Sequence, residues 1–445
     1  MAEKAWADMT ADERRAWRIE RWRNPEVEFV SPEAEAEYTA RVERLLAALE
    51  LRVPDRVPVS LNTGFWPALS AGLTPYESMN DPARARKAWI DFNAKFQPDA
   101  MSDPVHYTMP GAMFEALDYK LYAWPGSGVA KEGSYQYNEK EWMLPEEYDH
   151  LISDPSDYML RTYLPRTVGA FAGFGQLSSL FDFIELPFVS GHAGGWDSPE
   201  MVTSLERLAE AGRLRNTWWN ETAVPVMDQL LSLGFPAYRS CGTKAPFDIL
   251  GDTLRGTRGV ITDMFRYPDK VLAACDRLVQ VAVDWPLKRP AAPATPVVFI
   301  PLHKGADGFM SDEQFRTFYW PSLRKLLVGL IDEGMIPFCF AEGRYNARLE
   351  AIMDLPKGKT VWLFDQTDMA RAKETIGTVA CLEGNMPLSL LYAGTQEEVA
   401  AHTRKLIDMA GAGGGYILDI GAVADEGNDE NLAAMMETAK EYGVY

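Results

Sequence analysis

Five short apolar runs in the second half of the chain each end on a polar residue. They read VVFIPLH, IPFCFAE, VWLFD, VACLE and YILD, and they end at His303, Glu342, Asp365, Glu383 and Asp419. A continuous run of Val, Ile, Leu and Phe is typical of a strand that is buried on both faces of a parallel sheet. Because ligands collect at the carboxyl ends of such strands, the pattern predicts a site where these runs end.

Three earlier segments complete a set of eight predicted strands. RVPVSLN ends at Asn62, PDAMSD ends at Asp103, and FPAYRSCG contains Cys241 near its end. After the third strand, strands and helices alternate strictly, which predicts an α/β fold of the (β/α)8 TIM barrel type. A doubly wound open sheet is the alternative, but no GxGxxG follows an early strand and no GxxxxGK[ST] loop occurs.

The pattern also predicts how the chain is divided. Residues 1–50 are predicted to form an N-terminal helical arm, and residues 51–445 are predicted to form the barrel. A long stretch of Gly, Pro and aromatic residues separates the second and third strands and is predicted to be an insertion that covers the site. The arm is rich in Arg and Trp, so we expect it to pack against its own domain or a twin subunit, and a homodimer is reasonable.

Composition narrows the class of protein and its partners. Hydrophobic residues make up 47% and charged residues 24%, which is ordinary for a globular protein. A net charge of −20 argues against nucleic acid and anionic membranes as partners. The charged N-terminus lacks the apolar region of a secretory signal, so we expect a cytoplasmic location. The four cysteines include no CxxC pair and predict neither disulfides nor a zinc finger.

If the barrel forms, the strand ends meet at one mouth that is rich in carboxylates. Clustered carboxylates repel one another, so at least one should hold a proton, bind a metal, or face Lys304 or Arg344. The candidate catalytic residues are Glu342, His303, Asp103, Asp365 and Glu383. The candidate substrate-binding residues are Asn62, Phe65, Trp66, Trp196, Arg344, Tyr345 and Asp419. A zinc site would use His303, Glu342 and Glu383, although these match no local ligand spacing.

Several segments resemble the uroporphyrinogen decarboxylase superfamily. They are DGFMSDEQFRTFYWPSLRKLL, EGNMP, GGYILDIGAVADEGNDENLAAMMETAKEYG and, more loosely, PVSLNTGFWPALSAGLTPYESMNDP and PFDILGDTLRGTRGVITDMFRYPDKV. The resemblance implies a barrel with its site at the strand ends, as the strand pattern also predicts.

The chain departs from the site patterns of two branches of that superfamily. True uroporphyrinogen decarboxylases have an arginine-rich segment after the first strand and a histidine in a final GH motif. Here the segment reads NTGFWPAL, and Gly421 is followed by Ala422. The corrinoid and thiol methyltransferases hold zinc through an HxC motif and a later cysteine, where this chain has Phe340, Glu342 and Ala422.

The resemblance, read with these departures, leads to a hypothesis about function. We expect a corrinoid-dependent methyltransferase that takes the methyl group from a small aromatic methyl ether and gives it to a corrinoid carried by a partner protein. Glu342 and His303 would protonate the leaving oxygen or bind a metal, because an ether oxygen is a poor leaving group. A decarboxylase of a small aromatic or heterocyclic acid and a non-catalytic ligand-binding barrel remain the alternatives.

Overall fold

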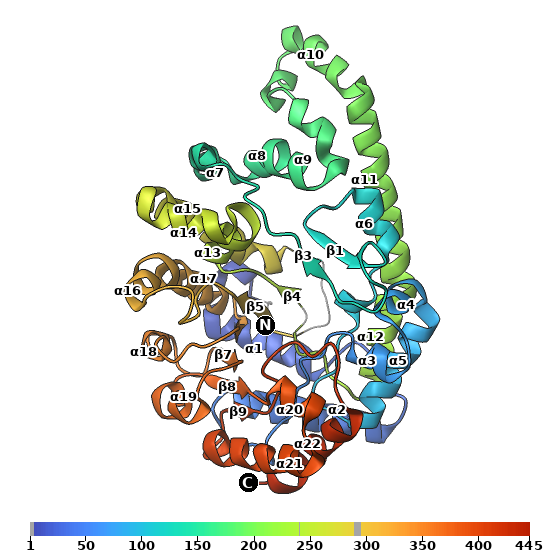
Figure 1. The fold of residues 1–445 in the computed structure, drawn as a ribbon, viewed down its shortest axis with the longest axis vertical. Helices are drawn as coiled ribbons and strands as arrows, with labels where there is room; N and C mark the ends of the chain where they lie inside the picture. The colour runs from blue at the N-terminus through green and yellow to red at the C-terminus, as the bar shows by residue number, and fades with distance from the viewer. Residues whose placement is uncertain (1–3, 240, 289–294) are drawn as a thin grey trace.

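The computed structural model describes residues 4–239, 241–288 and 295–445. Its main sheet has six parallel strands in chain order (Figure 1). These strands are β4 (Cys241–Gly242), β5 (Val297–Leu302), β6 (Ile336–Ala341), β7 (Val361–Phe364), β8 (Cys381–Gly384) and β9 (Tyr416–Ile417). The residues of β6, β7 and β8 are all buried, as their continuous apolar sequences predict.

The first two predicted strands join this sheet through isolated backbone contacts. Val59 forms a parallel bridge with Leu418 beyond the end of β9. The Asp99 N–H donates to Val59 O at 2.8 Å, and the Met101 N–H donates to Pro236 O at 2.9 Å, just before β4. The parallel α/β arrangement is consistent with the predicted barrel fold, and the strand ladder is continuous from β4 to β9.

Helices follow the strands on the outside of the sheet (Figure 1). After β4 they are α13 (Pro246–Asp248), α14 (Gly256–Arg266), α15 (Pro268–Leu287), α16 (Asp312–Gln314), α17 (Trp320–Asp332), α18 (Leu349–Ile352), α19 (Met369–Ile376), α20 (Leu388–Ala393), α21 (Gln396–Leu406) and α22 (Asp429–Tyr442). In α17 the buried Leu323, Leu326 and Leu330 recur every three or four residues and turn one apolar face toward the sheet.

The N-terminal arm consists of α1 (Ala11–Arg23) and α2 (Pro32–Leu49). Thr10 and Glu13 form a capping box that starts α1. The indole N–H of Trp22 donates to Ala237 O at 2.9 Å, and the ring of Trp22 stacks on Tyr238. Trp22 and Tyr38 are buried in the same apolar cluster as Val297 and other strand residues. The arm therefore shares a core with the sheet.

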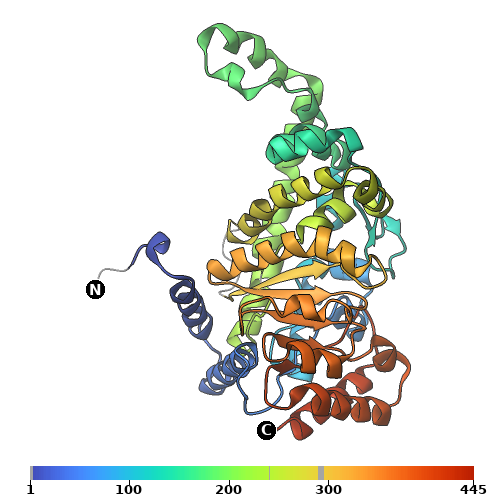
Figure 2. The ribbon, with the colours of Figure 1, turned by 90° about the vertical axis from the view of Figure 1, so that its left-hand side faces the viewer.

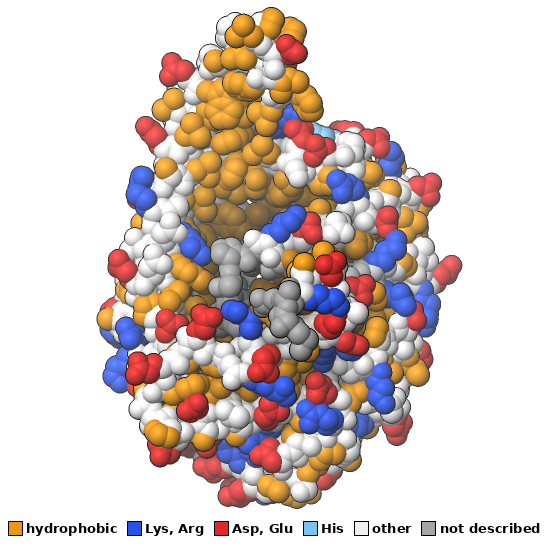
Figure 3. Space-filling view, turned by 180° about the vertical axis from the view of Figure 1, so that it is seen from behind, with side chains coloured by type: hydrophobic (Ala, Val, Ile, Leu, Met, Phe, Trp, Pro, Cys, Tyr) orange, Lys and Arg blue, Asp and Glu red, His pale blue; other side chains and the backbone are white. Residues whose placement is uncertain are grey.

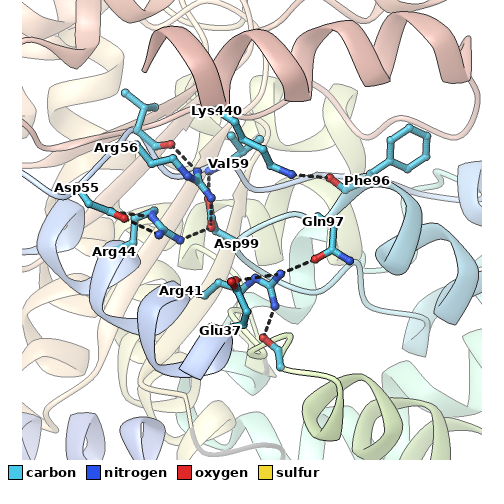
Figure 4. Close-up of polar contacts among 12 residues, drawn as sticks. Glu37, Arg41, Arg44, Asp55, Arg56, Val59, Phe96, Gln97, Asp99 and Lys440 are labelled. Atoms are coloured by element: carbon cyan, nitrogen blue, oxygen red, sulfur yellow. Dashed lines mark hydrogen bonds and ion pairs between the residues drawn. The ribbon is translucent and has the colours of Figure 1, made fainter. Parts of the chain in front are cut away.

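A buried ion network ties α2 to the first two strand segments (Figure 4). Asp99 is almost fully buried and accepts hydrogen bonds from Arg44 at 2.7 Å and from Arg56 at 2.8 Å. The Val59 N–H donates to the same carboxylate at 2.8 Å. Arg44 also pairs with Asp55 at 2.6 Å. Because every charge has an opposite partner, the network can be buried without an isolated ion.

A long insertion separates the second and third strand segments, as predicted. Before it lie α3 (Trp66–Ser70), α4 (Pro75–Asn80) and α5 (Pro82–Phe96). It contains α6 (Gly111–Leu117), β1 (Tyr122–Pro125), β2 (Gly128–Val129), β3 (Gln136–Tyr137), α7 (Tyr148–Ser153), α8 (Pro155–Tyr158), α9 (Leu164–Thr167), α10 (Leu186–Ala193), α11 (Pro199–Trp218) and α12 (Val224–Ser232). Strands β1 to β3 form a small separate sheet.

The insertion extends the molecule beyond the barrel. Residues 177–197, here called the insertion tip, include α10 and project from the barrel at the end of α11 (Figures 1 and 2). In Figure 2 the tip leans toward the side on which the N-terminal arm lies, and the sheet strands run toward the opposite side. Within residues 4–239, 241–288 and 295–445, every helix is too short or too polar to cross a bilayer.

Candidate active site

His303 lies at the centre of the polar groups that follow the strand ends. It comes directly after β5, and its ring contacts carboxylates on both sides. Nδ1 lies 2.5 Å from Asp252 Oδ2, and Nε2 lies 3.4 Å from Glu342 Oε1. The side chain of His303 is 32% exposed and that of Glu342 is 43% exposed. Both groups therefore remain within reach of a small ligand.

Asp252 belongs to the helical segment that follows β4. It lies in a π-helical turn, Ile249–Leu254, and its side chain is only 8% exposed. Lys244 Nζ contacts Asp252 Oδ2 at 2.9 Å, and Lys304 Nζ contacts Oδ1 at 3.1 Å. The Asp252 carboxylate thus contacts three cationic side chains. The two lysine contacts hold it in its position beside His303.

These contacts determine the charges in the site. Burial alone would raise the pKa of Asp252, but the hydrogen bond with His303 and the charge of Lys244 lower it far below its ordinary range. Burial alone would lower the pKa of His303, but hydrogen bonds with Asp252 and Glu342 outweigh it and raise that pKa to about 10. His303 is therefore an imidazolium at neutral pH and can donate a proton.

Asp248 binds the backbone at the same strand end. Its carboxylate accepts hydrogen bonds from the backbone N–H groups of His303 at 3.1 Å and Lys304 at 2.9 Å. The hydroxyl of Tyr319 donates to it at 2.7 Å. Burial, followed by repulsion from Asp252, raises the pKa of Asp248 to about 6. Asp248 thus positions the backbone of the residue that carries the imidazolium.

Glu342 and Asp365 lie at the ends of the next two strands, β6 and β7. The Gly343 N–H donates to Asp365 Oδ2 at 3.0 Å. Burial raises the pKa of Asp365, and the charge of Glu342 adds to that rise. The structure therefore brings Asp365 near the His303–Glu342 pair, in agreement with the order of the strands.

A second polar cluster surrounds Glu383 and Asp419. Tyr238 donates its hydroxyl to Glu383 Oε2 at 2.9 Å, while Glu383 Oε1 is buried without a hydrogen-bond partner. Burial and the charge of Asp419 raise the pKa of Glu383 well above its ordinary value. Arg239 contacts Asp419 at 3.3 Å and donates to Asn62 Oδ1 at 3.2 Å. Asn62, Glu383 and Asp419 thus form one group around Arg239.

Asp103 lies beside this second cluster. Its Oδ1 accepts a hydrogen bond from the Val105 N–H at 2.7 Å. Burial raises the pKa of Asp103, and the nearby charges of His106 and Arg239 oppose that rise. Phe65 lies close by, with its ring 5.0 Å from Tyr107 and 5.4 Å from Tyr135. Phe65 is fully buried, so these rings form a small aromatic cluster behind this part of the barrel end.

The small sheet of the insertion brings tyrosines toward Asp252 and Glu342. The Tyr137 hydroxyl donates to the backbone O of Asp252 at 2.5 Å, and the Tyr122 ring lies 5.0 Å from that of Tyr137. Burial, followed by the charges of Asp252 and Glu342, raises the pKa of Tyr122. As the sequence predicts, the insertion approaches the candidate site, and it does so with residues that can pack on a planar ligand.

Other predicted ligand-binding residues are dispersed. Trp66 is buried, and its indole N–H donates to Asp429 at 2.9 Å. Trp196 lies in the insertion tip, where its ring packs against Phe183. Arg344 is exposed, and the hydroxyl of the buried Tyr345 donates to Leu302 O at 2.9 Å. Of these, Tyr345 lies next to the strand that carries His303.

The strand pattern did not identify several residues of the site. Lys244, Asp248 and Asp252 recur at intervals of four in TKAPFDILGD, a spacing that places them on one helical face. That spacing is the sequence signal from which these three residues could be predicted to lie together. Arg239 carries no comparable signal, because it lies inside a predicted strand.

The proposed zinc ligands do not converge. His303 and Glu342 are neighbours, but Glu383 belongs to the cluster around Arg239. Within the described ranges, no group of at least three His, Cys, Asp or Glu side chains is arranged to hold a metal ion. Lys244 and Lys304 would also repel a divalent cation near Asp252. This donor set therefore does not fit zinc.

Comparison with known proteins adds sequence relatives. Residues 241–442 match the family model of uroporphyrinogen decarboxylase (URO-D). The uroporphyrinogen decarboxylase of Cellvibrio japonicus is 26% identical over 199 residues, which cover 44% of this chain and 54% of that protein. The enzyme of Azoarcus sp. is 26% identical over 149 residues, which cover 30% and 38%. The chain thus spans about half or less of these curated relatives.

Comparison with solved structures extends the likeness to nearly the whole chain. A methyltransferase from Methanosarcina mazei superimposes with a TM-score of 0.56 and 16% sequence identity. The match covers 91% of this chain and 98% of that one. At this identity the likeness shows a shared fold.

Proposed function

Because this chain belongs to the uroporphyrinogen decarboxylase superfamily through residues 241–442, we propose that it is an enzyme that demethylates a small aromatic methyl ether. The methyl group passes to a corrinoid that a partner protein carries. The observation that carries the proposal is the His303 imidazolium, which Asp252 and Glu342 hold at the end of β5.

The chain departs from the site patterns of uroporphyrinogen decarboxylases and of zinc-dependent thiol methyltransferases. These departures support a reaction other than uroporphyrinogen decarboxylation. The segment NTGFWPAL has no arginine to hold a multiply carboxylated substrate, and Ala422 follows Gly421. Glu342 and Ala422 stand where a zinc-dependent thiol methyltransferase would have cysteines. Proton donation by His303 is the chemistry that the remaining groups support.

In the proposed reaction His303 protonates the ether oxygen as its bond to the methyl carbon breaks. The electron pair of that bond stays on the oxygen, so the product is a phenol. The corrinoid supplies the nucleophile that accepts the methyl group. Phenols have a pKa of about 10, and the pKa of His303 is also about 10. Proton transfer between groups of matched pKa favours an aryl ether over an alkyl ether.

The neighbouring groups have supporting roles in this proposal. Asp252 keeps the imidazolium charged and oriented, and the half-exposed Glu342 returns a proton from solvent to Nε2. Asp365, Asp103 and Glu383 provide further polar contacts around the substrate. Tyr122 and Tyr137 of the insertion supply aromatic surface for a planar ring, whereas Phe65 and Tyr345 are buried and remain predicted substrate contacts. Trp66 and Trp196 remain predicted ligand contacts without a step in the reaction.

The test supplies the purified chain with a cob(I)alamin carrier and a panel of methoxylated aromatics, and measures phenolic products. We expect demethylation by the wild type and a loss of about 100-fold or more in His303→Gln, the range for a general acid. His402→Gln on the outer helix α21 is the matched control and should retain full rate. Absence of any phenolic product across the panel would refute demethylation.

Decarboxylation is the second candidate, because the curated relatives that match are decarboxylases. The same imidazolium could protonate the carbanion that remains when carbon dioxide leaves. Substrate-dependent release of carbon dioxide without a corrinoid would favour this reaction. If Glu342→Ala left ligand affinity unchanged, and neither reaction were detectable in the wild type, a non-catalytic binding barrel would be favoured.

A further inference from the structure

The insertion tip exposes an unusual amount of apolar surface. Leu186 is 88% exposed, Phe181 is 76% exposed and Ile184 is 72% exposed. Leu180, Phe183 and Phe188 are also exposed by 41% or more. Figure 3 shows hydrophobic side chains gathered on this projecting part and in the hollow beneath it. Large apolar groups in this number are costly to leave in water.

The tip has internal contacts that hold its two ends together. Leu180–Phe183 form a short 3-10 helix, and α10 follows at Leu186. His192 Nε2 lies 2.9 Å from Asp182 Oδ2, and the Trp196 ring packs against Phe183. These contacts connect the two ends of the tip, so less conformational entropy is lost when the apolar residues meet a partner.

We propose that the insertion tip joins two copies of this chain through a two-fold interface. The six apolar side chains named above expose roughly 700 Å² in each copy, and two such faces reach the total of about 1,200–2,000 Å² that stable interfaces bury. An isologous contact buries the same patch on both chains.

The position and charge of the tip favour a second copy of the chain over other binding partners. The tip leans toward the side of the N-terminal arm, whereas the strand ends that carry His303 face the other way (Figure 2). A corrinoid partner must reach those strand ends, so it would dock elsewhere. Between Arg166 and Arg207 the chain has five acidic residues and no lysine or arginine. An anionic lipid surface would repel that segment.

The test measures the mass of the full chain by light scattering during size-exclusion chromatography. We expect the wild type to elute at twice the chain mass of 49.8 kDa. The double variant Phe181→Glu/Leu186→Glu should elute as a monomer, because four carboxylates would meet in the interface. The wild type and the double variant should have the same circular dichroism spectrum, since the altered residues are exposed.

Phe265→Glu is the matched control, because Phe265 is 73% exposed on α14 and lies outside the tip. It should remain dimeric. Hydrogen exchange of residues 180–188 should also be slower in the concentrated wild type than in the diluted protein. A monomeric wild type at 100 µM, or a dimer that survives the double substitution, would overturn the proposal. Binding of the monomer to vesicles of neutral lipid would assign the tip to a membrane surface instead.

Discussion

His303 shows how the charge of one residue depends on groups that are distant in sequence. Its ring is partly buried, which disfavours the imidazolium, yet Asp252 at 2.5 Å reverses that preference. Asp252 can do this because Lys244 and Lys304 keep its own carboxylate ionised. The sequence identified His303 and Glu342 as partners of one site, and the structure brings them within 3.4 Å.

Replacing Asp252 by Asn should change the pH dependence of the proposed reaction. The pKa of His303 should fall from about 10 toward its ordinary 6.5, because the main acceptor at Nδ1 loses its charge. The alkaline limb of kcat/KM should then move down by two or more pH units, and an NMR titration of the His303 ring should show the same change. Asp354→Asn, in the exposed pair with Arg324, should leave the profile unchanged. An unmoved alkaline limb in Asp252→Asn would contradict the assigned role.

The same residue links folding to pH. Between pH 6.5 and about 10 the folded chain holds a proton on His303 that the unfolded chain has lost. The contribution of His303 to stability is therefore complete below pH 6.5 and decreases as the pH rises through about 10. Urea unfolding should show that decrease in the wild type. The decrease in unfolding free energy should be smaller in His303→Gln, because that variant lacks the titrating ring.

At the scale of elements, the barrel depends on contacts that the strand pattern does not reveal. The strands β5 to β9 follow from apolar runs, and their predicted ends agree closely with the structure. The segments that contain Val59 and Asp99 join through isolated backbone bonds, and the ion network of Figure 4 supports them. Asp99 was not predicted to be important, because a buried carboxylate inside a strand has no distinctive local sequence.

Asp99→Ala should destabilise the chain by about 3 kcal/mol or more, because Arg44 and Arg56 would lose the buried carboxylate that pairs with them. Urea unfolding followed by circular dichroism measures the change. Asp91→Ala is the matched control, since Asp91 pairs with Lys87 on the exposed face of α5. That substitution should cost less than about 0.5 kcal/mol. Equal effects of the two substitutions would show that the network contributes little.

At the scale of the whole molecule, the N-terminal arm and the barrel share one core. The predicted division at residue 50 describes a change in sequence pattern, and it remains a prediction about domains. Trp22 of α1 is buried against Tyr238, whereas Trp17 of the same helix is 38% exposed. The arm therefore contributes apolar contacts to the end of the barrel at which the strands begin.

Trp22→Ala should lower the stability of the whole chain by about 3 kcal/mol, the usual cost of removing a buried aromatic ring. Thermal unfolding followed by circular dichroism and by fluorescence should shift by the same amount, because arm and barrel lose a shared contact. Trp17→Ala should shift the midpoint only slightly. An early transition confined to fluorescence in Trp22→Ala would instead indicate that the arm unfolds separately.

The sequence by itself determined the parallel α/β class, the order of strands β5 to β9 and their polar ends, because buried parallel strands require continuous apolar runs. It also determined that a long insertion follows the second strand. Only the tertiary structure decided which carboxylates meet. Glu342 and Asp365 lie with His303, while Glu383 and Asp419 lie with Arg239. The physical reason is that side-chain direction and helical turns between strands, which bring Asp252 to His303, depend on packing between segments far apart in the chain.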